Sequence, residues 1–307
     1  MSTIAGVAPI AHFLHTLRTG DPRVHGPLTM VPLLDGIHPD PGWLTFEEAA
    51  GKLTITEVSE GGQVPMLHLT NDADHPVLLV DGEELVGAKQ NRILNTTVLV
   101  AARTQATIPV SCVEEGRWAY RTRHFVPGEA LYARARAKKA AQVTAALMAG
   151  AGHRTDQHAL WKDVAERGRE LRVASETGAM HDLYGRYRGD IEGARKALAA
   201  TSDQIGALVW ISGRWAGLDI LASTRLFARA WRRLCAGYAA DALGSTPGEA
   251  LDPEPGEVMQ ALLEAATTPA PAVCLGREYR IADARFRGAA LVAEERVAHV
   301  MAFPATP

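Results

Sequence analysis

Hydrophobic and polar positions follow a strand-like pattern through the first third of the chain. Apolar residues recur at every second position or in short runs bounded by Gly, Pro, Asn or Asp, which is typical of β-strands. The pattern predicts strands at 27–34, 53–58, 64–70, 76–80, 96–102 and 107–113. We therefore expect residues 25–125 to be rich in β-structure, preceded by a short amphipathic helix at 3–19.

The hydrophobic period becomes helical after residue 127. Residues 129–150 contain no proline and many alanines, and alanine has the highest helix propensity. Asp156 is a candidate N-cap for a second helix, at 157–174. A third helix is expected at 180–200, where the apolar positions form one stripe. The predicted helical segment spans 128–200.

The C-terminal part, 205–303, combines strands with one long helix. Residues 206–221 have the pattern of a hairpin, and a helix at 224–243 follows it. A short helix at 257–267 and strands at 272–276, 278–284, 288–293 and 297–303 complete the prediction. Because strands and helices are grouped rather than strictly alternating, we expect an α+β fold in a single domain over residues 1–307.

Two hairpin-like segments resemble each other. VSCVEEGRWAYR (110–121) is similar to LVWISGRWAGLD (208–219), and an alanine-rich helix is predicted after each. An internal duplication would make 107–139 and 207–234 equivalent hairpin–helix units, with the two tryptophans in related environments. Convergence on common hairpin and helix compositions would produce the same likeness, and both interpretations remain open.

Charge and composition exclude some classes of partner. The 307 residues carry a net charge of −3 at pH 7, without the basic excess typical of nucleic-acid binders, so we expect no nucleic-acid partner. No apolar run reaches the roughly 18 residues of a membrane span, and we expect no membrane partner. The start of the chain lacks a signal-peptide pattern. Cys112, Cys235 and Cys274 have no metal-ligand spacing, which favours reduced thiols in a cytoplasmic protein.

A dense polar block lies between two apolar strands, at residues 81–95. Its candidate site residues are Asp81, Glu83, Glu84, Lys89, Gln90, Asn91, Arg92 and Asn95. Carboxylates can act as general bases, whereas lysine, arginine and amide groups suit phosphate or ribose. Gly82 and Gly87 would let the backbone approach a ligand closely. A solvated strand connection with scattered ion pairs is the alternative interpretation of the same residues.

The next polar turn adds Glu114 and Arg117 to this block. Cys112 precedes them on the apolar face of an alternating strand, so we expect a thiol packed in the core rather than a nucleophile. We predict Glu84, Lys89 and Glu114 as catalytic residues. The predicted ligand-binding residues are Asp81, Glu83, Gln90, Asn91, Arg92, Asn95 and Arg117.

The remaining candidates carry weaker signals. Arg214, Trp215 and Asp219 accompany the second Gly-Arg-Trp sequence, where a tryptophan packed in the core is the simpler explanation. The chain lacks a glycine-rich dinucleotide motif, a Walker A loop, a His-Glu-x-x-His sequence and a nucleophile elbow. We therefore expect no metal site, and the residues identify no cofactor.

Two long motifs resemble a bacterial domain family of unknown function. VLLVDGEELVGAKQNRILNTTVLV (77–100) and IPVSCVEEGRW (108–118) are similar to the ARG- and rhodanese-phosphatase-superfamily-associated protein domain family, and residues 206–243 resemble its second half. The family's most recognisable polar motif matches Asp81, Gly82, Glu83, Glu84, Gly87, Ala88, Lys89, Gln90, Asn91, Arg92 and Asn95. Its association with ADP-ribosylglycohydrolase-type and rhodanese or phosphatase genes implies a role in NAD or ADP-ribose metabolism.

Two classes of function are compatible with these observations. In the first, the protein binds or processes a small molecule that is ADP-ribose-like, NAD-derived or nucleotide-like, with or without catalysis. In the second, it is a non-catalytic interaction or accessory protein, and the block 81–95 is an edge that binds a partner. The residues favour neither an enzyme nor a particular oligomeric state.

Overall fold

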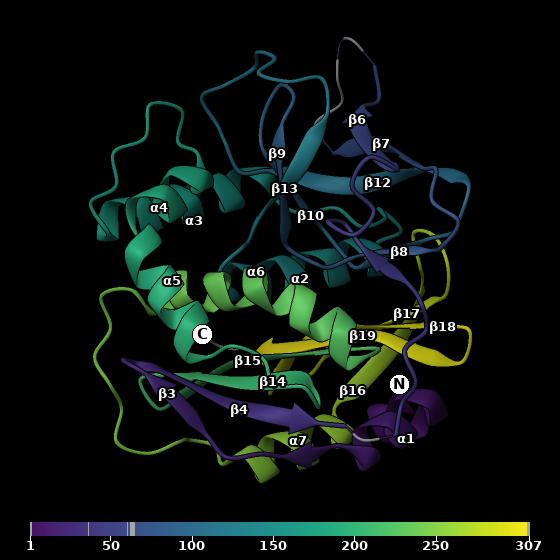
Figure 1. The fold of residues 1–307 in the computed structure, drawn as a ribbon, viewed down its shortest axis with the longest axis vertical. Helices are drawn as coiled ribbons and strands as arrows, with labels where there is room; N and C mark the ends of the chain where they lie inside the picture. Colours follow the sequence, from purple (N-terminus) through teal and green to yellow (C-terminus); the bar gives the residue numbers. More distant parts are fainter. Residues whose placement is uncertain (1, 36, 60, 62–64, 306–307) are drawn as a thin grey trace.

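The largest sheet joins strands from both ends of the chain (Figure 1). The computed structural model describes residues 2–35, 37–59, 61 and 65–305. The antiparallel order is β1-β16-β17-β18-β19-β15-β14-β4-β2, and β3 also pairs with β4. The bounds are β1 Ser2–Thr3, β2 Arg18–Thr19, β3 Arg23–His25, β4 Leu28–Leu34, β14 Gln204–Ile211, β15 Arg214–Leu221, β16 Ala266–Pro271, β17 Arg277–Ala282, β18 Phe286–Ala293 and β19 Arg296–Pro304. The C-terminal segment thus returns to the sheet that β4 begins, by pairing β14 with β4.

Helices cover both faces of this sheet (Figure 1). The face toward the smaller sheets packs against α2 (Ala133–Met148) and α6 (Thr224–Ala242), and the opposite face packs against α1 (Ala8–Thr16) and α7 (Pro255–Glu264), with a 3-10 turn at Ile4–Gly6. The α6 helix starts at Ser223, whose hydroxyl accepts the Leu226 N–H at 3.2 Å. Its apolar side presents Phe227 and Trp231, which stack at 5.3 Å between ring centroids.

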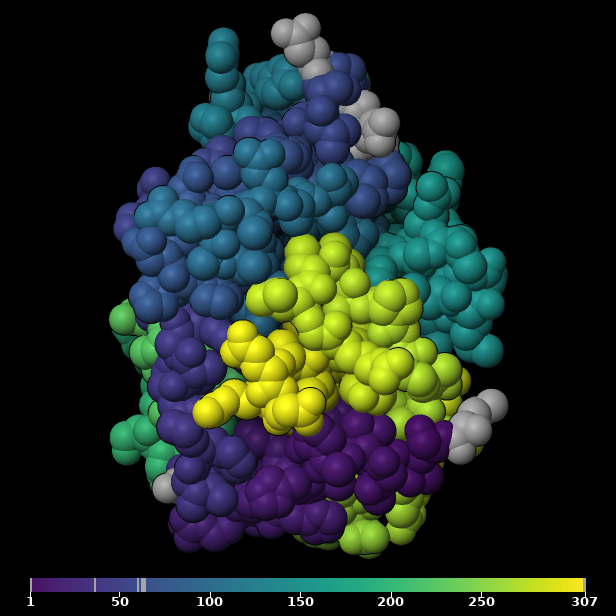
Figure 2. All heavy atoms as spheres, turned by 90° about the vertical axis from the view of Figure 1, so that its right-hand side faces the viewer, coloured from purple at the N-terminus to yellow at the C-terminus, as the bar shows by residue number. Residues whose placement is uncertain are grey.

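Two smaller sheets face each other across a third apolar core. One has the order β13-β9-β10-β12-β7-β6, and the other the order β11-β8-β5. Their bounds are β5 Leu44–Thr45, β6 Leu53–Glu57, β7 Met66–Asn71, β8 Val77–Leu79, β9 Glu83–Gly87, β10 Arg92–Leu94, β11 Val98–Val100, β12 Thr104–Cys112 and β13 Phe125–Ala130. Ile55, Leu69, Leu79, Val98 and Val110 fill the space between them. Figure 2 shows these sheets (blue) above the C-terminal strands (yellow-green), with the N-terminal helix (purple) at the opposite end.

The helical segment differs from its prediction at one point. The α3 helix (Gln157–Glu170) starts at the predicted cap, where the Asp156 carboxylate accepts the N–H groups of His158 and Ala159 at 3.0 Å. The single helix predicted at 180–200 is instead two, α4 (Met180–Arg186) and α5 (Arg188–Ala197). Glycines on both sides of Tyr187 lower the local helix propensity, which explains the break.

The C-terminal strands also differ from their prediction. No strand forms at 272–276; β16 instead occupies 266–271, directly after α7. The sequence pattern did not predict this strand because it contains Pro269 and Pro271, and proline lacks the N–H that a central strand needs. Both prolines pair with β17 on one side. On the other side lies the edge strand β1, whose described residues pair with Ala266 and Thr267 rather than with the prolines.

The fold class is α+β, as predicted. The internal duplication is not confirmed: β14 and β15 pair as a hairpin, whereas β12 and β13 are separated by β9 and β10 in their sheet. Trp118 is 47% exposed and Trp215 only 8% exposed, so their environments differ. Among the helices that the structure describes, none combines the length and apolar character that a membrane crossing requires.

Candidate functional site

The polar block 81–95 lies inside the protein. It contains two strands, β9 and β10, which the sequence pattern did not reveal, and each of its predicted site residues is less than 9% exposed. The alternative of a solvated connection is therefore wrong. Burying so many charged groups costs several kcal/mol unless each finds a partner, so the partners determine what each residue can do.

Three of the predicted residues lie between the sheets and helices of the larger core. Asp81 forms ion pairs with Arg136, at 3.4 Å, and with Lys139, both from α2. Lys139 also donates to the Asn95 carbonyl at 2.9 Å. Glu83 pairs with Arg233 of α6. These contacts attach the smaller sheets to the helices, and Asp81, Glu83 and Asn95 line none of five prominent cavities of the described residues.

A second group forms around Asn91. Its backbone N–H donates to Glu114 at 3.0 Å, and its side-chain N–H donates to Glu84 at 3.3 Å. Arg117 donates to Glu114 through Nε at 2.8 Å and Nη2 at 2.6 Å, and to the Asn91 Oδ1 at 3.2 Å. Burial alone would raise the pKa of Glu114, but hydrogen bonds from Arg117, Asn91 and Thr177 lower it below its usual value. Glu114 is therefore a charged anchor for Arg117.

A third group lies on the opposite face of the β9–β10 hairpin. Arg92 donates to the Gln90 Oε1 at 2.8 Å and contacts the Cys112 thiol, which is fully buried as expected. Its Nη2 lies 3.7 Å from an oxygen of Glu57, at the end of β6. Neither Glu57 oxygen, nor the Nε and Nη2 of Arg92, has a hydrogen-bond partner among the described residues. Burial lowers the pKa of Arg92 to about 10.

Lys89 lies beside two exposed aromatic rings. Its Nζ is 5.2 Å from the ring centroids of both Trp118 and Tyr120, and it donates to the Gly61 carbonyl at 3.0 Å. Trp118 also lies 5.5 Å from the Arg92 guanidinium carbon. The aromatic rings are about half exposed, so each keeps part of its surface free for a ligand.

These groups border a polar cleft of about 820 Å³, within the size range of small-molecule sites. Its walls are Thr56, Glu57, Ser59, Tyr120, Arg123 and His124. The described residues contain no group of three or more His, Cys, Asp or Glu side chains that could hold a metal ion. Charge, aromatic surface and an incomplete buried ion pair thus meet at one place, which makes this cleft the candidate site.

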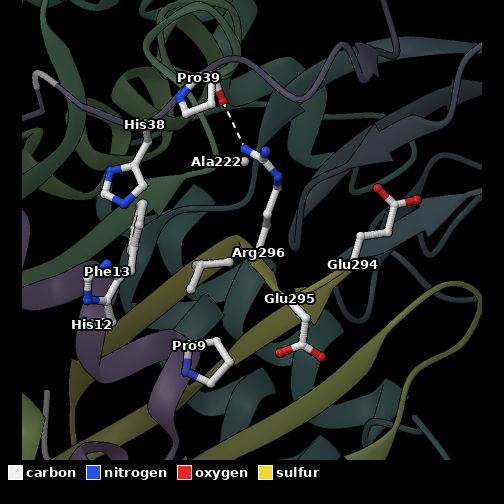
Figure 3. Close-up of a pocket in the computed structure, with 10 residues that line it drawn as sticks. Pro9, His12, Phe13, His38, Pro39, Ala222, Glu294, Glu295 and Arg296 are labelled. Atoms are coloured by element: carbon white, nitrogen blue, oxygen red, sulfur yellow. Dashed lines mark hydrogen bonds between the residues drawn. The ribbon is translucent and has the colours of Figure 1, made fainter.

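Another cavity of about 420 Å³ lies between α1 and the β18–β19 turn (Figure 3). His12, Phe13 and His38 line one side, and Arg296 donates to the Pro39 carbonyl at 3.2 Å. Figure 3 shows the carboxylates of Glu294 and Glu295 pointing away from the two histidines. Because its charged groups do not converge and none is an unpartnered buried group, this cavity is a weaker candidate.

None of the predicted site residues lines the cleft, and the prediction missed Glu57, Tyr120 and Arg123. Lys89 and Arg92 were predicted and lie beside it, next to Tyr120 and Glu57 respectively, and Gln90 contacts Arg92. The sequence pattern could have indicated Glu57. In LTITE it lies on the same face of the strand as Leu53 and Ile55, so a carboxylate occupies an apolar face. Nothing in the sequence distinguished Tyr120 and Arg123, whereas His124 follows the polar turn of Glu114 and Arg117 as a nearby histidine.

Fold and site together define an α+β protein whose smaller sheets carry a buried polar layer beneath an open polar cleft. The chain belongs to the ARG and Rhodanese-Phosphatase-superfamily-associated Protein domain family, whose model matches residues 16–303. No curated protein and no solved structure matches the chain.

Proposed function

We propose that the cleft binds a nucleotide-like ligand of the ADP-ribose class. The observation that carries this proposal is the incomplete pair of Glu57 and Arg92. A buried carboxylate without a donor costs free energy, and so does a guanidinium N–H without an acceptor. A hydroxyl group that reached this pair would donate to Glu57 and accept from Arg92, and the ribose of such a ligand supplies two adjacent hydroxyls.

Residues in the walls of the cleft, and others beside it, suit the remaining parts of this ligand. Trp118 and Tyr120 offer flat, half-exposed rings on which a base can stack, worth about 1–3 kcal/mol per base. Lys89 and Arg123 supply positive charge for a pyrophosphate. Lys89 was predicted as a catalytic residue, but in this proposal its ammonium group binds the pyrophosphate. The family's link to ARG and rhodanese-phosphatase-superfamily proteins agrees with an ADP-ribose-related ligand.

Tryptophan fluorescence and calorimetry test the proposal. The wild-type protein is titrated with ADP-ribose, AMP, ribose 5-phosphate and inorganic phosphate. We expect ADP-ribose to bind most tightly and to quench Trp118, and a concentration of 100 times Kd to stabilise the fold by about 2.7 kcal/mol. Trp118→Ala should remove the quenching. Glu57→Gln should weaken binding about 10- to 100-fold, because it removes a charged hydrogen-bond acceptor.

Glu294→Gln, at the cavity of Figure 3, is the matched control and should bind as the wild type does. Equal weakening by both glutamine variants would contradict the assignment of the cleft. If none of the four ligands binds, and a protein partner co-purifies with the wild type but not with Trp118→Ala, the protein is a non-catalytic interaction or accessory protein instead.

A further inference from the structure

Glu84 and His181 form a carboxylate–imidazole pair on the helical side of the β9–β10 hairpin. His181 Nδ1 lies 3.1 Å from Glu84 Oε2. The Glu84 side chain is fully buried, whereas the His181 side chain is 48% exposed. The buried oxygen engages Nδ1, so the other ring nitrogen, Nε2, is left to interact with a ligand.

The protein holds the Glu84 carboxylate firmly. Asn91 donates to Oε1 at 3.3 Å, and the backbone of Glu129 donates to the same carboxylate. The chain also approaches closely at Gly128, where an added Cβ would lie 2.5 Å from Glu84 Oε2. Burial raises the pKa of Glu84 above its usual value, and its contact with Nδ1 orients His181 before any ligand arrives.

His181 lines a third cavity, of about 340 Å³, separate from the cleft and from the cavity of Figure 3. Glu129, Tyr184, Arg188, Glu192 and Arg195 share its walls. Arg195 is neutralised by ion pairs with Glu129 and Glu192. Arg188 forms no ion pair with any described carboxylate, so its charge remains available to a ligand in this cavity.

We propose that His181 is the general base of a second, hydrolytic site for small carboxylic esters, with Glu84 as its positioning residue and Arg188 as its stabilising charge. Nε2 accepts a proton from water, and the water oxygen bonds to the acyl carbon. The carbonyl oxygen becomes a singly charged oxyanion, which matches the single available guanidinium of Arg188. The ester C–O bond then breaks, and the leaving oxygen takes the proton back from Nε2.

The surroundings of His181 fix the direction of its pH dependence. Carboxylates face it from three elements, namely Glu84 of β9, Glu129 of β13 and Asp182 of α4, while Arg188 and Arg195 line the same cavity from α5. The hydrogen bond to Glu84 raises the pKa of His181 above its usual value. Hydrolysis requires neutral His181, so its rate should rise with pH through this raised pKa.

Turnover of para-nitrophenyl acetate by the full chain, from pH 5 to pH 9, tests this site. We expect several turnovers per molecule, and kcat/KM lower by about 10²- to 10⁴-fold in His181→Ala, the range of general-base catalysis. His158→Ala removes another exposed histidine, on α3, and should leave the rate unchanged. Arg188→Met should lower kcat more than it changes KM.

Glu84→Gln separates positioning from a structural role. It keeps the shape of the side chain but removes its charge, so the midpoint of the pH–rate profile should move to lower pH. An unshifted midpoint, no turnover beyond one equivalent, turnover of para-nitrophenyl phosphate in place of the acetate, or equal loss in His181→Ala and His158→Ala would each overturn the proposal. His181→Ala should still bind ADP-ribose in the cleft, so the two proposals can fail separately.

Discussion

Asp219 is the most heavily bonded carboxylate between the large sheet and α2, and its removal tests how the buried charges contribute to stability. Arg136 donates to its two oxygens at 2.9 and 2.7 Å. Tyr238 donates at 2.8 Å, and His299 lies at 3.0 Å. Asp219→Asn keeps the volume of the side chain but, among the described residues, leaves the fully buried Arg136 with the more distant Asp81 as its counter-ion.

The size of the effect follows from the ion pair and from the pKa. Removing one partner of a buried pair costs about 3–5 kcal/mol of the free energy of unfolding. Burial opposes ionisation, but Arg136 and His299 lower the pKa of Asp219 from 3.8 to about 2. Ionised Asp219 therefore contributes about 2 kcal/mol to the free energy of unfolding above pH 3.8, and this contribution is lost as the pH falls toward 2. We therefore expect a loss of about 3–5 kcal/mol at pH 7 that shrinks below pH 4.

Urea unfolding followed by tryptophan fluorescence at pH 7, 4 and 3 measures this loss. Asp74→Asn is the matched control, because Asp74 also pairs with an arginine, Arg103 at 2.6 Å, but both side chains are exposed. Its stability should equal that of the wild type within error. The reasoning is refuted if the Asp219 variant is as stable as the control at pH 7, or if its deficit is the same at all three pH values.

Two further variants test the groups around Asn91. Gly128→Ala should lower the melting temperature and cost about 1–3 kcal/mol, because its Cβ would collide with Glu84. Gly185→Ala, where nothing lies within 4 Å, should be neutral or stabilising, and equal circular-dichroism melts for both would contradict the packing argument. Arg117→Met should cost about 3–5 kcal/mol by leaving Glu114 buried and charged. Adding Glu114→Gln should restore part of this loss in urea unfolding, and a double variant less stable than the single one would refute the pairing.

Local patterns were enough to predict the elements with a single clear period. The hairpin at 206–221 is confirmed as β14 and β15, because two apolar segments flank a turn at Ser212 and Gly213, both of which have positive φ. The helix predicted at 224–243 is α6, which has a serine cap at Ser223 and no proline or mid-helix break. In these segments, propensity, capping and hydrophobic pattern all favour the same structure.

Partners distant in sequence could not be predicted in this way. Asp81 meets Arg136 and Lys139, which lie more than 50 positions away, and Asp219 meets His299 across 80 positions. Charged residues in helices and loops usually face solvent, so nothing local showed that these are buried. The same limit applies to His181, which no sequence feature distinguished from the other ten histidines.

The geometry of β-strands explains why one polar block in the sequence contributes to two separate places in the fold. Neighbouring residues of a strand point to opposite faces of the sheet, and Leu85 on β9 follows directly after Glu84. Arg92 pairs in register with Leu85, and Ile93 pairs with Glu84. Arg92 therefore shares the Leu85 face, beneath the cleft, whereas Glu84 points toward the helices and His181. The sequence placed Glu84 and Arg92 in one predicted site because it shows their proximity along the chain, but only the pairing register determines which face each side chain occupies.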